Sequence, residues 1–166
     1  MNSFNLNIIS IKNYDSYENK AKQAAALFIK VFNLPLFRGM VNTFTWNGQN
    51  QFANNAGLTN NQIFEKLIAG TSLTSPVANN IADIKLEVYA QLWWPFGPAI
   101  GYSDTENGII YTKRHFVNSA TLPQLAGHYA HEYCHLLGFE HDFNATDQRQ
   151  FSVPYGIGDI VETMAS

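Results

Sequence analysis

The chain has few residues that form covalent cross-links or strong electrostatic patches. Its 166 residues include one cysteine, Cys134, so neither an internal disulfide framework nor a metal site made of cysteine alone is possible. Only 14% of the residues are charged, and the formal net charge is −3. We therefore expect no nucleic-acid partner, because binding to a phosphate backbone requires a clustered excess of Lys and Arg. Any metal that the fold needs must be bound by histidine and carboxylate side chains.

Long apolar segments are also absent. No apolar run approaches the roughly 18 residues that a membrane-spanning helix requires. The first residues, MNSFNLNIISIKNYD, contain no basic region, long apolar core or small-residue cleavage site, so no Sec signal is predicted. The compartment stays open: the sequence fits a cytoplasmic protein, a protein exported by a non-classical route and a protein secreted after processing. At this length we expect one domain, 1–166, and we assume a monomer.

Hydrophobic periodicity predicts an α+β fold. Helices are expected at four places: 17–33, 60–69, 122–138 and 157–165. Strands are expected at 4–11, 41–46 and 81–93, followed by two short strands joined through the turn SDTENG. Asp15 or Ser16 is the expected cap of the first helix, which should end before Pro35. Thr59 and Gln62 form the pattern of a capping box for the second helix.

Three of the five histidines lie close together in the segment HEYCHLLGFEH, residues 131–141. A helix over 122–138, with Thr121 as its cap, places His131 and His135 on the same face, one turn apart. Two imidazoles in this arrangement can bind one metal ion through nitrogen, which is typical of zinc. The spacing therefore predicts a metal site on this helix.

The residues around these two histidines predict a catalytic site rather than a structural one. Gly138 can adopt the left-handed conformation that ends a helix, after which His141 can return to the same ion. Three protein ligands leave a fourth position for water or a substrate carbonyl, as in catalytic zinc sites. Glu132 points in a neighbouring direction and suits a general base that accepts a proton from water activated by the metal.

The segment HEYCHLLGFEH satisfies the whole pattern H-E-x-x-H-x-x-G-x-x-H, and so resembles the metzincin clan of zinc metallopeptidases. By that resemblance, His131, His135 and His141 bind one Zn²⁺ and Glu132 is the general base. Asp142 also matches many members, in which this carboxylate has a supporting structural role. The resemblance implies a zinc-dependent endopeptidase that acts on a peptide or protein substrate.

The resemblance also implies an architecture. A metzincin-like chain would have a twisted mixed sheet, a backing helix and an active-site helix in an N-terminal subdomain, here 1–138, and a short C-terminal subdomain, here 139–166. The backing helix would be the segment near Tyr17 to Asn33. The strand near Gly108 to Thr112 would be the antiparallel edge strand, which holds an extended peptide by main-chain pairing. The helix near Asn60 to Ala69 has no counterpart in this scheme.

The sequence departs from the clan at the methionine of the tight turn below the metal. Met164 is the only methionine after the motif, and it falls in the predicted closing helix. We therefore expect the turn at 152–155, with Val153 where the family has methionine. Tyr155 then lies two positions later, where some members use a tyrosine to bind zinc or stabilise the oxyanion. The alternative is a tyrosine packed in the turn, with its hydroxyl on a backbone group.

Other residues near the motif have simpler interpretations. His128 is expected to be a partly exposed helical histidine, and His115 a solvated residue at a strand end. Cys134 is expected to be a buried thiol packed against the sheet. Three aromatic residues could line a specificity pocket, but a hydrophobic rim or core is the simpler expectation for them: Trp93, Trp94 and Phe96.

Two other functions fit the same motif. The chain could be a zinc-stabilised binding or virion-associated module without proteolytic activity, which agrees with the missing turn methionine and the short C-terminal part. Glu132 argues against this function, because a structural zinc site has no need of a base. The third function is a zinc hydrolase of a non-peptide amide, because the motif specifies the metal and the base but not the substrate.

Overall fold

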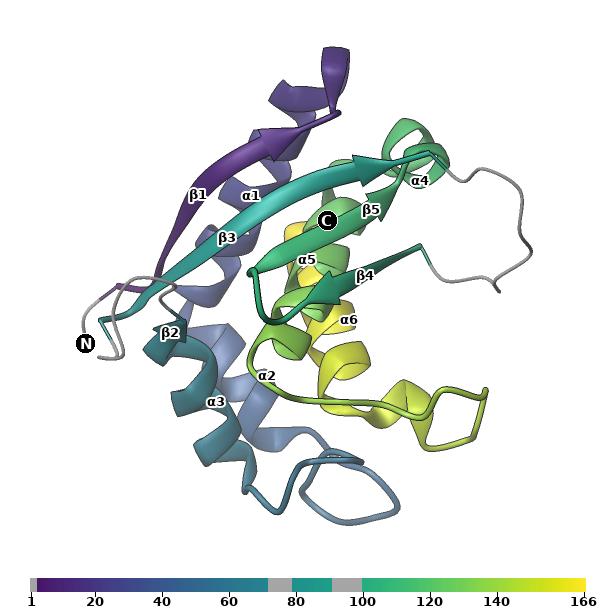
Figure 1. Cartoon of the computed structure of the whole chain (residues 1–166). Coiled ribbons are helices and arrows are strands. Elements are labelled where there is room, and N and C mark those ends of the chain that lie inside the picture. The colour runs from purple at the N-terminus through teal and green to yellow at the C-terminus, as the bar shows by residue number, and fades with distance from the viewer. Residues whose placement is uncertain (1–2, 72–78, 91–99) are drawn as a thin grey trace.

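The computed structural model describes residues 3–71, 79–90 and 100–166 (Figure 1). It has the expected α+β architecture, a twisted mixed sheet with several helices. In chain order the elements are β1 (Asn5–Lys12), α1 (Glu18–Phe32), α2 (Pro35–Thr43), α3 (Asn60–Ala69), β2 (Gly70–Thr71), β3 (Ile81–Tyr89), β4 (Gly101–Asp104), β5 (Ile109–Lys113), α4 (Arg114–Ser119), α5 (Leu122–Leu136) and α6 (Val153–Ala165). Short 3-10 turns lie at Asp15–Tyr17 and Arg149–Phe151.

The sheet has the strand order β1-β3-β5-β4, and β2 also pairs with the start of β3. β1 and β5 run parallel to β3, whereas β4 runs antiparallel to β5. The expected edge strand at Gly108–Thr112 is therefore wrong, because β5 lies inside the sheet and β4 forms the edge. The turn SDTENG predicts both strands of the hairpin, but it does not show which of them pairs with β3. Ile110 and Thr112 of β5 are buried, whereas β4 is short and partly exposed, as an edge strand is.

Helices α1, α5 and α6 lie behind the sheet in the view of Figure 1. Alternate residues of β3 point toward these helices and are buried, among them Ile84, Leu86 and Val88. Within the helical layer, the ring of Phe28 in α1 lies 5.6 Å from that of Tyr133 in α5, measured between centroids. Burying such side chains contributes about 1.5–3 kcal/mol each. This packing fixes α5, the helix that bears the histidines, against the sheet.

The first helix forms where it is expected, within one residue at each end, but its predicted caps are wrong. Asp15 and Ser16 belong to the 3-10 turn before α1, and Tyr17 occupies the N-cap position without a side-chain hydrogen bond. The Asp15 carboxylate instead lies 3.0 Å from the guanidinium of Arg114 at the start of α4. A tertiary ion pair thus replaces the local cap.

The predicted strand at 41–46 is also wrong, because the first half of this segment belongs to α2. Pro35, expected to follow the end of α1, is instead the first residue of a new helix, where its missing N–H costs nothing. Phe37 and Val41, four residues apart, are the buried positions of this helix. Trp46 forms only an isolated bridge with Gln49.

Helix α3 follows the sequence closely, whereas helix α4 was not expected. Helix α3 begins with the Thr59–Gln62 capping box and ends before Gly70. Strand β3 ends at Tyr89, and the next residue, Ala90, is exposed. The predicted segment 91–93 and the aromatics Trp93, Trp94 and Phe96 lie outside the described residues.

Two further observations concern the helices. The closing helix, α6, begins four residues earlier than expected, at Val153, and packs against α5. In the part of the chain that the structure describes, no single helix is long and apolar enough to cross a membrane. Two consecutive segments, 15–32 and 35–43, meet that test only as a pair bent by 73°.

Candidate metal centre

Helix α5 begins with a capping box that the sequence shows. The side chain of Thr121 accepts a hydrogen bond from the backbone N–H of Gln124, and the Gln124 side chain accepts one from the N–H of Thr121. Pro123 lies in the first turn, where no intrahelical bond is lost. In the helix that begins here, residues four apart, such as His131 and His135, share one face.

The end of α5 returns the chain toward that face. Leu137 is the C-cap, and Gly138 has a φ of +83°, the left-handed conformation that glycine adopts without a steric penalty. The N–H of Phe139 donates to the carbonyl of Cys134 at 3.0 Å, which satisfies a carbonyl of the last turn. The Phe139 side chain is fully buried and anchors the loop. His141 follows two residues later.

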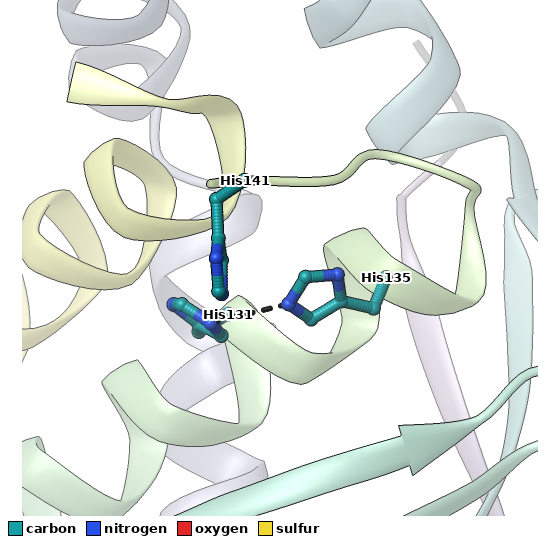
Figure 2. Close-up of side chains that lie close together, drawn as sticks. All are labelled: His131, His135 and His141. Carbon is teal, nitrogen blue, oxygen red and sulfur yellow. Dashed lines mark hydrogen bonds between the residues drawn. The ribbon is translucent and has the colours of Figure 1, made fainter. Parts of the chain in front are cut away.

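Three imidazoles converge at this point (Figure 2). One potential ligand atom from each of His131, His135 and His141 lies within 4.8 Å of the other two. The Nε2 atoms of His131 and His135 are 3.3 Å apart. Two nitrogens bound to one tetrahedral zinc at about 2.0–2.1 Å would also lie about 3.3 Å apart. A hydrogen bond between the two rings would give the same separation, so this distance alone does not indicate a metal site. The third imidazole, that of His141, makes the group suitable for an ion.

Hydrogen bonds at the far nitrogens orient two of these rings. The Nδ1 of His135 lies 2.8 Å from the carbonyl oxygen of Phe139, and the Nδ1 of His141 lies 3.0 Å from that of Asp142. A carbonyl can only accept, so each Nδ1 carries the hydrogen and each Nε2 lone pair is free for a metal. Burial lowers the pKa of His131 and of His135, which keeps both rings in the neutral form that binds metals.

Glu132 lies beside the triad but outside the group of ligand atoms. It is only 3% exposed, and its Oε2 atom lies 2.6 Å from the hydroxyl of Ser103 on strand β4. Burial raises the pKa of Glu132 to about 7, although the Ser103 hydrogen bond opposes the shift. A carboxylate with a pKa near neutrality can accept and return a proton, which is what a general base must do.

A chain of buried polar side chains continues behind Glu132. The Nδ1 of His128 lies 3.7 Å from Oε1 of Glu132, and its Nε2 lies 3.0 Å from the hydroxyl of Thr112. Tyr14 donates to Thr112 at 3.4 Å, and its hydroxyl is 2.9 Å from that of Tyr129. Burial lowers the pKa of His128 to about 3, so the ring is neutral and its contact with Glu132 is not an ion pair.

The expectation of a partly exposed His128 is therefore wrong. His128 is 4% exposed, because strand β4 covers that side of α5. His115 is exposed, as expected, but lies in helix α4 rather than at the end of a strand. Cys134 is fully buried, as expected.

The structure places Tyr155 against the triad. Its ring meets that of His131 edge-on, with centroids 4.6 Å apart, and lies 4.9 Å from that of His141. The guanidinium of Arg149 lies 5.2 Å from the Tyr155 centroid on another side. Tyr155 thus packs directly on two of the three histidines.

The segment expected to form the tight turn is not a turn. Ser152 is the N-cap of α6, and Val153 to Tyr155 form its first helical turn. Val153 is fully buried there, whereas Met164 lies near the far end of α6 and packs partly buried against the core. Pro154, which suits the first turn of a helix as well as a loop, explains the difference.

Asp142 ties the loop after His141 to a distant segment. Its carboxylate accepts hydrogen bonds from Asn54 at 3.0 Å, from Gln148 at 2.9 Å and from Thr146. These bonds lower the pKa of Asp142. Asn54 carries no sequence signal for this contact, because the two residues are 88 positions apart.

Comparison with known proteins finds no relative of the chain. No protein-family model, curated protein or solved structure matches the chain. The likeness to metzincins therefore rests on the residues of the motif.

Proposed function

We propose that the chain is a zinc-dependent endopeptidase. The observation that carries the proposal is the convergence of three imidazoles, two with their Nε2 lone pairs freed by carbonyl hydrogen bonds, next to a carboxyl whose pKa burial raises to about 7. His131, His135 and His141 would hold the ion. Zinc bound there would supply Lewis-acid activation of water and of a carbonyl group.

Other residues of the chain would then have separate roles in the reaction. Glu132 accepts a proton at its carboxylate as water attacks the scissile carbonyl, and gives that proton to the leaving amine. Tyr155, packed on His131 and His141, is a candidate to donate its hydroxyl to the developing oxyanion. Among residues 3–71, 79–90 and 100–166, β4 is the last strand of the sheet, and an extended peptide could be added beside it by main-chain pairing.

The deciding experiment compares two carboxylates near the histidines. Glu132→Gln removes the base, whereas Glu140→Gln alters a 76% exposed carboxylate that lies 3.5 Å from Nδ1 of His135. We expect each variant to bind one zinc per chain. The wild type and Glu140→Gln should cleave a diverse synthetic peptide library, read by mass spectrometry, and Glu132→Gln should lose at least about 10²-fold in kcat. Equal cleavage by Glu132→Gln would exclude the role of this residue.

One observation favours a second function, a zinc-stabilised binding module without proteolytic activity. Glu132 is 3% exposed and hydrogen-bonded to Ser103, so its carboxylate already has a protein partner. In that case one zinc would bind to the wild type, no peptide would be cleaved, and removal of zinc would unfold the domain. The third possibility is hydrolysis of a non-peptide amide, in which case no peptide would be cleaved either. It would give turnover of small acyl amides that Glu132→Gln abolishes.

A further inference from the structure

Ser103 makes two contacts with one residue of the active-site helix. Its Oγ lies 2.6 Å from Oε2 of Glu132 and 2.9 Å from the backbone carbonyl oxygen of the same residue. Ser103 belongs to β4, the edge strand, and is half-buried. A side chain of the sheet edge thus contacts both the carboxylate and the backbone of the proposed base.

A hydroxyl is suited to this position because it has one hydrogen and two acceptor lone pairs. It can donate to the ionised carboxylate of Glu132. Because it has only one hydrogen, it donates to one of these two oxygens at a time, and the contact with Oε2 at 2.6 Å is the shorter one. The hydroxyl therefore joins the carboxylate of Glu132 to the edge strand of the sheet.

The other carboxylate oxygen is restricted from behind. Nδ1 of His128 faces Oε1 at 3.7 Å, and His128 is itself held at Nε2 by Thr112. Both groups are buried, so they leave the carboxylate little freedom to rotate. Ser103 supplies the short contact, and His128 limits the space.

We propose that Ser103 is a positioning residue that holds the Glu132 carboxylate in its reactive orientation. This inference deepens the proposed function and rests on it. Ser103 acts through Glu132, so its loss should lower kcat and leave KM unchanged. A residue that only tethers the strand to the helix would instead change stability and leave kcat unaltered.

The test uses the zinc-loaded chain and the fastest-cleaved peptide from the library. Ser103→Ala removes the hydroxyl, and Ser103→Thr keeps it. Ser10→Ala is the matched control: Ser10 lies in β1, is also half-buried, and its hydroxyl has no hydrogen bond within 3–71, 79–90 and 100–166. We expect kcat of Ser103→Ala to fall 10- to 100-fold, with KM within twofold, zinc content unchanged and most of the rate restored by threonine. A kcat equal to that of the wild type would overturn the role of Ser103 and leave the peptidase proposal intact.

A second measurement does not depend on activity. Urea midpoints of the metal-free wild type, Ser103→Ala, Glu132→Ala and the double variant form a cycle that isolates the contact between the two side chains. We expect the double variant to lose less than the sum of the single losses, and additive losses would overturn the contact. If the wild type cleaves no peptide, the proposed function fails. A non-additive cycle would then leave a structural contact and overturn the positioning role.

Discussion

At the scale of single residues, burial acts in opposite directions on two neighbours one helical turn apart. It lowers the pKa of His128 to about 3 and raises that of Glu132 to about 7. In each case the neutral form is favoured, because a buried charge without a strong partner is costly. The protein therefore keeps two titratable groups next to the histidine triad without holding either as a permanent charge.

The pKa of His128 predicts an acid sensitivity of the metal-free protein. Its folded value, about 3, lies below the ordinary 6.5, so its contribution to stability is complete above pH 6.5 and is lost as the pH falls toward 3. We expect His128 to contribute a loss of up to about 1.4 kcal/mol per pH unit in this window, whereas Glu132, with its pKa raised to about 7, contributes stability as the pH falls below that value. Urea unfolding between pH 7 and 4 measures it. His128→Leu should flatten the slope, and His115→Leu, at an exposed position, should not. Equal slopes in all three proteins would contradict the prediction.

The sequence identified some of these residues and not others, for a physical reason. His131, His135 and His141 follow from helix spacing and one glycine, which are local features. The contacts of Ser103 and His128 depend on strand β4 lying at the sheet edge beside α5, which local patterns do not determine. Ser103 also lies within a hairpin segment that is read first as a turn signal.

At the scale of elements, α5 and α6 approach each other through two glycines. A Cβ on Gly127 would lie 2.8 Å from the carbonyl oxygen of Gly158, and one on Gly158 would lie 3.3 Å from Cβ of His131. Only hydrogen fits at these positions without a movement of the helices. The glycine contact therefore lets α6 lie directly beneath the histidine-bearing part of α5.

This contact predicts opposite effects of alanine at two glycines. Gly127→Ala should destabilise the protein, because an overpacking cost of about 1–3 kcal/mol exceeds the gain of about 1 kcal/mol in helix propensity. Gly39→Ala, at an exposed position of helix α2 with no neighbouring atom within 4 Å of the new Cβ, should stabilise it by about 0.5–1 kcal/mol. Urea denaturation measures both changes. A neutral Gly127→Ala would mean that the helices can separate at no cost.

Capping boxes made the starts of two helices predictable, whereas helix α2, which lacks a side-chain cap, was missed. The Thr-x-x-Gln boxes at Thr59 and Thr121 are local and mark the starts of α3 and α5. Helix α2 has no side-chain cap, and its first residue, Pro35, resembles the stop signal of the preceding helix. The β-branched and aromatic residues of the segment 41–46 favour a strand by propensity. The burial of Phe37 and Val41 in the core favours a helix instead.

At the scale of the whole molecule, the proposed zinc would join the end of α5 to the loop that follows it. His141 lies outside the helix, in a loop that Asp142 links to Asn54. A ligand that binds only the folded chain adds about 2.7 kcal/mol when present at 100 times its Kd. Zinc should therefore stabilise more than the helix end alone.

We expect zinc to raise the melting temperature by roughly 5–10 °C for a chain of this size. Addition of a chelator should reverse the shift. His141→Ala should lose most of it, because the loop then supplies no ligand, whereas His115→Ala should keep it. The shift should shrink in acid, because the imidazoles must be neutral to bind, and the lowered pKa of His131 and of His135 moves their protonation below the ordinary histidine value. Thermal scans with and without zinc measure it, and an equal shift in His141→Ala would contradict a three-histidine site.

The single cysteine lies in the same helix as the metal ligands, between His131 and His135, with its side chain fully buried and the pKa of its thiol raised by burial. Such a thiol reacts with an alkylating reagent only when α5 lifts away from the core. The rate at which this thiol is alkylated, followed by intact mass, would therefore measure how often α5 separates from the core and the candidate site opens.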